Sequence, residues 1–167
     1  MSRRNIFYII ATALIVILAY LGYKGYEVYT IKKKSADNIQ NLPDLSFQFL
    51  KPLHSGSDKK KIINYFSSDC EHCLFMTEQI IKHKDQLNNS EILMITADNL
   101  EKAQNFQRSY GIDSLDFINI GVDTSHAFMR LFGSTAIPSF YIYDEAGRLT
   151  SSYKGEIKIE KLIDSIK

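Results

Sequence analysis

The only two cysteines in the chain, Cys70 and Cys73, are separated by two residues and carry the clearest chemical signal in the sequence. Before them, an apolar and aromatic run over residues 62–66 predicts a buried strand. After them, apolar residues recur at helical spacing as far as Leu87. The small and acidic residues 67–69 are typical of a helix start. A strand, a tight turn and C-x-x-C at the head of a helix is the arrangement that a redox-active dithiol needs.

At the head of that helix, the Cys70 sulfur would face free backbone N–H groups and the positive end of the helix dipole, which stabilise a thiolate. Cys73, three residues later, would resolve the mixed disulfide that the first sulfur forms with a partner. His72, when protonated, would stabilise the Cys70 thiolate, and Glu71 would oppose it by charge repulsion. Because these two effects have opposite signs, the sequence leaves the reduction potential open.

Other uses of the two cysteines are less favoured. A structural disulfide would close a very short loop and add little stability. A zinc site normally has four Cys or His ligands, and the chain has no second C-x-x-C and no H-x-x-x-H. A copper-binding module would need His126 within bonding distance of both sulfurs, and a peroxidase would need a T-x-x-C that is absent. The sequence therefore predicts redox chemistry with no metal and no cofactor.

Two further segments point to the same chemistry. They are T-A-I-P-S-F-Y-I-Y-D-E-A-G-R over residues 135–148 and A-D-N-L-E-K-A-Q-N-F-Q-R-S-Y-G-I over residues 97–112. Together with C-x-x-C, these segments resemble the TlpA-like bacterial thiol-disulfide oxidoreductases, which are membrane-anchored thioredoxin-like proteins. The resemblance covers residues 42–167. It implies a thioredoxin-like α/β fold, in which a central mixed sheet is covered by helices on both faces, preceded by one N-terminal transmembrane helix.

The resemblance also implies roles for residues outside C-x-x-C. Pro138 corresponds to a cis-proline that faces the dithiol and leaves the backbone of Ile137 free to pair with substrate. Thioredoxins often have a buried Asp where this chain has Asn64, which cannot accept a proton and which TlpA-like relatives commonly share. In some relatives an acidic residue near the dithiol aligns with Asp98, which would accept the Cys73 proton if burial raises the pKa of its carboxyl. The alternative is that Asp98 caps the following helix.

The sequence departs from the family pattern at two positions beside the motif. Asp69 replaces the aromatic residue usually found before the first cysteine, and it adds a negative charge next to the nucleophile. Leu74 replaces a frequent basic residue. Both changes bear on which partners dock. We interpret His83 as a surface residue and His126 as structural.

The chain divides into four regions. Residues 1–5 are predicted as a cytoplasmic N-terminus, and residues 6–23 as a membrane anchor, because they contain no charge over 18 residues. As a helix this run would be about 27 Å long, close to the ~30 Å hydrocarbon core of a bilayer, and no A-x-A-like cleavage site follows it. Residues 24–41 form a polar, basic linker that either continues the helix or acts as a tether. Residues 42–167 form the domain.

Location and partners follow from the resemblance more than from charge. Arg3 and Arg4 precede the anchor and Lys24 and Lys32–Lys34 follow it, so the positive-inside count is close to a tie. The resemblance implies a single-pass protein of the bacterial inner membrane whose domain faces the periplasm and reduces protein disulfides, with a membrane thiol carrier as electron donor. Oxidation or isomerisation by the same dithiol is the alternative. Residues 41–167 carry 14 basic and 17 acidic side chains, which disfavours nucleic-acid binding.

The remaining periodicity indicates strands alternating with helices and a closing hairpin, which is typical of an α/β domain with both sheet faces covered. Glycines 111 and 133 are placed to end two of the helices. A loop is expected over residues 51–61. The further expected strands are 46–50, 92–97, 117–122, 139–143 and 149–154, and the further expected helices are 100–110, 125–132 and 157–167.

Overall fold

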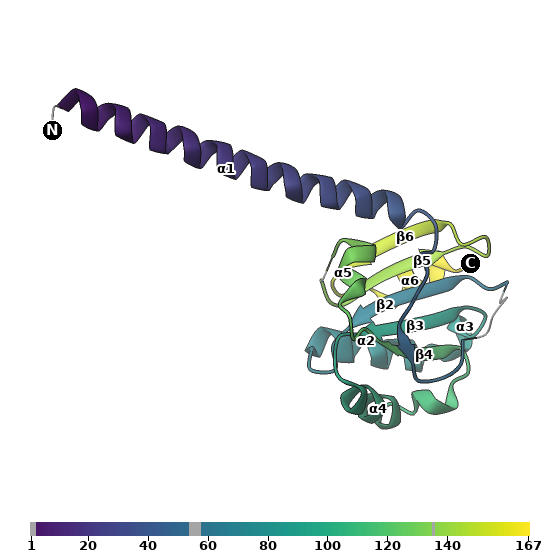
Figure 1. Cartoon of the computed structure of the whole chain (residues 1–167). Helices are drawn as coiled ribbons and strands as arrows, with labels where there is room; N and C mark the ends of the chain where they lie inside the picture. The colour runs from purple at the N-terminus through teal and green to yellow at the C-terminus, as the bar shows by residue number, and fades with distance from the viewer. Residues whose placement is uncertain (1–2, 54–57, 135) are drawn as a thin grey trace.

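The computed structural model describes residues 3–53, 58–134 and 136–167. Figure 1 shows a long helix, α1 (Arg3–Asn38), that projects from an α/β domain. This helix covers the region predicted as an anchor and most of the predicted linker, so the linker continues the helix. Part of the predicted loop over residues 51–61, namely residues 54–57, lies outside the described residues.

No helix among the described residues is both long enough and apolar enough to cross a membrane. The membrane-spanning helix predicted over residues 6–23 is therefore not found among them. That prediction includes positions 6, 7, 9 and 11, whose side chains lie outside the description.

The described strands form one six-stranded sheet in the order β1-β4-β3-β2-β5-β6. Strand β2 is central, and it pairs in parallel with β3 and antiparallel with β5. The mixed sheet confirms the α/β part of the predicted fold class, and the predicted strands are correct to within one residue at each end except for the first. Of residues 46–50, only two form a strand. The strands are β1 (Gln48–Phe49), β2 (Lys61–Phe66), β3 (Glu91–Thr96), β4 (Ile118–Val122), β5 (Ser139–Tyr143) and β6 (Leu149–Lys154).

The predicted helices 100–110, 125–132 and 157–167 are correct to within two residues at each end, and the helix after C-x-x-C differs more. The helix that follows C-x-x-C does not run to Leu87, because His83 leaves the helical region with φ −107° and ψ 25°. Its Nδ1 also lies 2.9 Å from the carbonyl oxygen of Gln79, in the last turn. Two predicted helix ends, at Gly111 and at Gly133, are confirmed. Both glycines have left-handed φ angles, 62° and 64°. The helices are α2 (Glu71–Lys82), α3 (Lys84–Leu87), α4 (Leu100–Ser109), the 3₁₀ turn η1 (Ile112–Ser114), α5 (Ala127–Phe132) and α6 (Ile159–Ser165).

Helices cover both faces of the sheet, as predicted. On one face, α2, α4 and α6 bury apolar side chains such as Met76, Phe106 and Leu162 against the strands. On the other face, α5 and the segment after α1 pack on the sheet, and Phe128 stacks on Tyr65 with ring centroids 3.9 Å apart. Phe128 and Tyr65 are thus part of the core, and the burial of their large aromatic surface stabilises the fold.

A lysine fastens the edge of the sheet to the η1 turn. The Nζ of Lys51 donates to three backbone carbonyls, those of Ile112, Leu115 and Ile118, at 2.8, 2.9 and 3.1 Å. Burial lowers the pKa of Lys51, and the charges of Asp116 and Asp113 oppose that shift. An ammonium group has three protons to donate, so this side chain can donate to all three carbonyls at once.

We expect Lys51→Met to lower the free energy of unfolding by about 2–3 kcal/mol, because it removes three hydrogen bonds from a charged donor. Urea unfolding followed by circular dichroism measures the change. The matched control is Lys158→Met, at an exposed position, which should change the free energy by less than about 0.5 kcal/mol. A loss for Lys51→Met no larger than that of the control would contradict the expectation.

Candidate active site

The two cysteines lie at the first turn of α2 in different surroundings. Cys70 is the N-cap residue, with extended backbone angles, and its thiol is partly exposed. Its carbonyl accepts from the backbone N–H groups of Cys73 and Leu74, both at 2.9 Å. Cys73 is only 1% exposed, and neither cysteine is in a disulfide. The predicted place of Cys70 at the helix N-terminus is confirmed.

The prediction that residues 67–69 cap this helix is wrong. Cys70 itself is the cap residue, and no side chain accepts from the first turn. The backbone N–H of Cys70 instead donates to the carbonyl of Ser67 at 3.3 Å, which closes a tight turn. This leaves the first N–H groups of α2 without a side-chain acceptor, in a position that favours a thiolate on the adjacent sulfur.

Burial is the main cause that raises the pKa of the Cys73 thiol, to about 12. A hydrogen bond with the Cys70 side chain raises it further, as do the charges of Cys70 and Asp98, and only a backbone hydrogen bond from Ser67 opposes the shift. Cys73 therefore holds its proton at neutral pH. The pair consists of one accessible sulfur at a helix N-terminus and one buried, protonated sulfur.

Asp98 holds the turn that precedes Cys70. Its carboxylate accepts from the backbone N–H of Ser68 at 2.8 Å and from the hydroxyl of Ser67 at 3.5 Å. Burial raises the pKa of this carboxyl, but hydrogen bonds from Ser68 and Thr96 and the charge of Lys102 outweigh it, so the pKa is lowered overall. The expected rise in the pKa of Asp98 is therefore wrong, because the carboxylate is hydrogen-bonded in its charged form.

Asp98 does not cap the following helix either. The N-cap of α4 is Asn99, whose side chain accepts from the backbone N–H of Lys102. The role of Asp98 as proton acceptor for Cys73 stays a prediction.

The charged residues around the motif have partners that the sequence did not reveal. The Nδ1 of His72 lies 2.7 Å from Oε2 of Glu156, and Asp69 pairs with the Nζ of Lys102 at 2.5 Å. Glu156 is 84 positions from His72, and no motif marks it. Lys102 could have been found from the sequence, because it follows Asp98 in the segment that the resemblance places beside the dithiol. The effects of Glu71 and His72 on the Cys70 thiolate stay predictions.

The loop that contains Pro138 lies at the end of the sheet where β2 leads into the turn to Cys70. The peptide bond between Ile137 and Pro138 is cis, as predicted. β5 begins at the next residue, Ser139, and pairs antiparallel with β2, whose last residues lead into the turn to Cys70. The buried amide of Asn64 in β2 donates to the carbonyl of Ser139 at 3.2 Å, and so ties the two strands together beside the loop. Pairing of the Ile137 backbone with substrate stays a prediction.

A copper site made of Cys70, Cys73 and His126 is not assembled. In the described part of the chain, no three His, Cys, Asp or Glu side chains gather as metal ligands. His126 instead begins α5 with a left-handed φ of 51°, at the N-cap position. Its side chain makes no cap hydrogen bond, so the structural interpretation of His126 stays a prediction.

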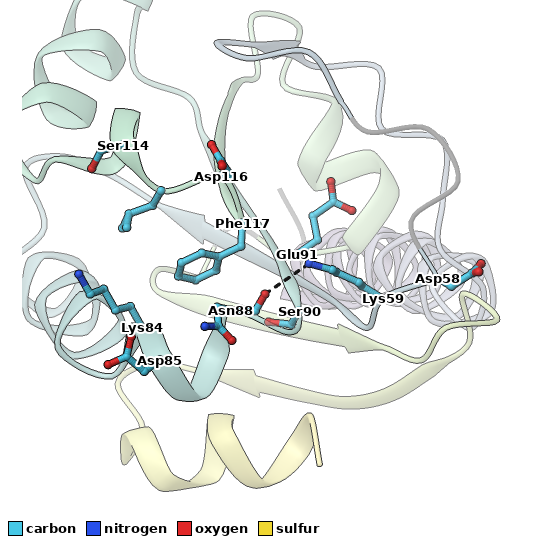
Figure 2. Close-up of a pocket in the computed structure, with 11 residues that line it drawn as sticks. Asp58, Lys59, Lys84, Asp85, Asn88, Ser90, Glu91, Ser114, Asp116 and Phe117 are labelled. Carbon is cyan, nitrogen blue, oxygen red and sulfur yellow. Dashed lines mark hydrogen bonds between the residues drawn. The ribbon is translucent and has the colours of Figure 1, made fainter.

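One hollow of the described structure lies away from the dithiol. Figure 2 shows a pocket of about 770 Å³ lined by charged side chains of both signs, including Lys59, Glu91 and Asp116. These residues precede or begin β2, β3 and β4, which are parallel, so the pocket lies at the sheet edge opposite to C-x-x-C. A smaller hollow of about 310 Å³ lies beside the dithiol turn, between that turn and α4, and Ser68, Asp69 and Lys102 help to line it.

Comparisons with solved structures agree with this architecture. A thiol-disulfide isomerase from Corynebacterium glutamicum is similar with a TM-score of 0.64 and 18% identity, over 78% of this chain and 97% of that one. A thioredoxin-like protein from Porphyromonas gingivalis has a TM-score of 0.57 and 19% identity, over 75% and 91%. StoA from Bacillus subtilis has a TM-score of 0.55 and 18% identity, over 66% and 84%. At these identities the likeness shows the thioredoxin-like fold.

A comparison with curated protein sequences finds no match. The family model described as Redoxin, in contrast, matches residues 42–165, which is nearly the whole domain and more than half of the chain. With a thioredoxin-like fold and a C-x-x-C pair at the head of α2, the chain belongs to the redoxin family and is a thioredoxin-like oxidoreductase.

Proposed function

We propose that this protein is a membrane-tethered, TlpA-like thiol-disulfide oxidoreductase that reduces disulfides of periplasmic proteins through Cys70 and Cys73. The observation that carries the proposal is the contrast between the two sulfurs, one partly exposed at the N-cap of α2 and the other 1% exposed one turn later. An attacking sulfur must be accessible to a substrate disulfide, and the resolving thiol must lie close to the attacking sulfur.

The reaction proceeds in two exchanges. The Cys70 thiolate attacks one sulfur of a substrate disulfide, the substrate S–S bond breaks, and the released substrate thiolate takes a proton. Cys73 then loses its proton and attacks the Cys70 sulfur, which releases the second substrate thiol and leaves a Cys70–Cys73 disulfide. Two electrons pass to the substrate. A membrane thiol carrier then reduces the Cys70–Cys73 disulfide.

The causes of the Cys73 pKa support this order of events. Two of the effects that raise it are the hydrogen bond with the Cys70 side chain and the charge of Cys70. Both end when Cys70 enters a mixed disulfide, so the Cys73 thiol becomes easier to ionise at the step that needs its thiolate. The backbone of Ile137 beside Pro138 is proposed to pair with the substrate chain, and Asp98 is retained as the candidate proton acceptor.

Oxidation or isomerisation of substrate thiols would use the same residues at a higher reduction potential. A redox titration of the Cys70–Cys73 couple separates these directions. A reduction potential near that of thioredoxin, about −270 mV, would support reduction of substrates, and a potential near −120 mV would support oxidation.

Membrane tethering rests on the start of the chain. Residues 6–23 carry no charge, and the large apolar side chains from Leu14 to Leu18 are more than half exposed along α1. This part of α1 projects away from the domain in Figure 1. Exposed apolar surface of this extent needs a partner, for which a lipid bilayer is suited.

The cysteines are expected to differ on substitution. Cys70→Ser should abolish reduction of a model protein disulfide, because it removes the nucleophile. Cys73→Ser should instead trap mixed disulfides, because nothing resolves them. Insulin reduction and non-reducing gel electrophoresis measure these two results. Wild-type activity in both variants would contradict the mechanism.

The raised pKa of Cys73 predicts selective alkylation. With a pKa of about 12, roughly one Cys73 thiol in 10⁴ is ionised at about pH 8. Iodoacetamide should therefore add one group to the reduced folded chain, at Cys70, as read by mass spectrometry. In guanidinium, where burial is lost, both cysteines should be labelled at the same pH. Equal labelling of both in the folded chain would rule out the proposed asymmetry.

The tether predicts that the full chain, expressed in a bacterium, stays in carbonate-washed membranes. Leu14→Asp with Leu18→Asp should release it, since each acid costs about 2.5–3.5 kcal/mol at the centre of a membrane helix. Tyr26→Asp with Tyr29→Asp, on the same helix beyond the apolar run, is the matched control and should stay bound. Protease digestion of the domain in intact spheroplasts tests the orientation. Wild-type protein in the carbonate wash would refute the tether.

A further inference from the structure

Lys102 occupies a helix position that normally disfavours a cation. It lies in the first turn of α4, where its backbone N–H donates to the side chain of the N-cap residue Asn99 at 2.9 Å. The N-terminus of a helix carries a partial positive charge, so acidic side chains stabilise this turn and basic ones destabilise it. Contacts outside α4 must therefore offset the unfavourable position of this lysine.

The contacts of Lys102 provide this compensation. Its Nζ lies 2.5 Å from Oδ2 of Asp69, and its charge also acts on Asp98, where it contributes to the lowered pKa of that carboxyl. Asp98 accepts from the backbone N–H of Ser68 at 2.8 Å. Lys102 therefore compensates two acids that bracket the turn immediately before Cys70.

The ion pair is placed at the surface beside the dithiol. Asp69 and Lys102 both line the hollow of about 310 Å³ next to the turn, and their side chains are 72% and 49% exposed. Exposed ion pairs contribute little to folding stability. Folding stability thus does not explain a lysine at this position, whereas its charge pairs with Asp69, the residue directly before Cys70.

We propose that Lys102 is a positioning residue of the dithiol, which draws the Asp69 side chain toward α4 and offsets the acidic charge around the Cys70 thiolate. This deepens the proposed function and rests on it. Without Lys102, uncompensated acids would disfavour the thiolate and slow its attack. The charged and titratable groups of the motif and of its contacts come from three places. The turn and α2 contribute Asp69, Glu71, His72 and Cys73, and Glu156 contacts His72. Asp98 lies after β3, and Lys102 lies in α4.

The test measures the reactivity of Cys70 alone. In the full chain carrying Cys73→Ser, Cys70 is the only thiol, and iodoacetamide is an uncharged probe of its thiolate fraction. We expect Lys102→Gln to slow alkylation at about neutral pH by about two- to fivefold at low salt, the range of an exposed ion pair. Lys102→Arg should retain the wild-type rate, and adding Asp69→Asn to Lys102→Gln should restore part of it.

Two controls separate charge from structure. Arg108→Gln removes the same charge from the last turn of α4 and should leave the alkylation rate unchanged. The loss in Lys102→Gln should shrink in about 1 M NaCl, because salt screens exposed charges within a few Å. A wild-type rate in Lys102→Gln, an equal loss in Arg108→Gln, or a loss independent of salt that arginine does not rescue would each overturn the proposal.

Insulin reduction tests the proposed function separately from the role of Lys102. If the wild-type chain does not reduce insulin, the dithiol reduction is wrong whatever the alkylation rates are. If insulin is reduced and Lys102→Gln does not alter Cys70 alkylation, only the role of Lys102 is wrong. Circular dichroism of each variant reports whether the fold is intact.

Discussion

Burial divides two sulfur atoms that the chain places three residues apart. Cys70 is the N-cap residue of α2 and stays partly exposed, while Cys73, one turn later, packs into the core with Phe66 and Met76. Removal from water disfavours the charged form of Cys73 and makes it a poor nucleophile until it is needed. The proposed order of attack and resolution depends on this contrast, and the contrast depends on how α2 packs on the sheet.

The turn between β2 and α2 is held from the neighbouring strand. β3 runs parallel to β2 and ends at the same edge, so the residues after it meet the turn that leads to Cys70. Asp98 accepts from the turn, and Lys102 pairs with Asp69 on it. On the other side, Asn64 ties β2 to the start of β5, where the cis peptide lies. The dithiol is thus positioned by three adjacent strands rather than by its own loop.

Much of the fold could be predicted because its signals are local. Continuous apolar runs gave the central strands, and glycines at positions 111 and 133 gave two helix ends, since only glycine adopts a left-handed φ without steric cost. The errors fall where local pattern competes with contacts from elsewhere. His83 ends α2 early by leaving the helical region, and the first strand is limited to the two residues that pair with β4.

The sequence by itself indicated redox chemistry, because C-x-x-C spacing before a helical pattern places one sulfur at a helix N-terminus and the second sulfur one turn later. It also determined the cis-proline segment, through its resemblance to a known family. Only the tertiary structure decided the electrostatics. The pKa of Asp98 is lowered rather than raised, since the backbone N–H of Ser68 reaches its carboxylate, and the side chains of Asp69 and His72 contact Lys102 and Glu156. Such pairings join residues far apart in the chain, and no local pattern encodes the distance between them.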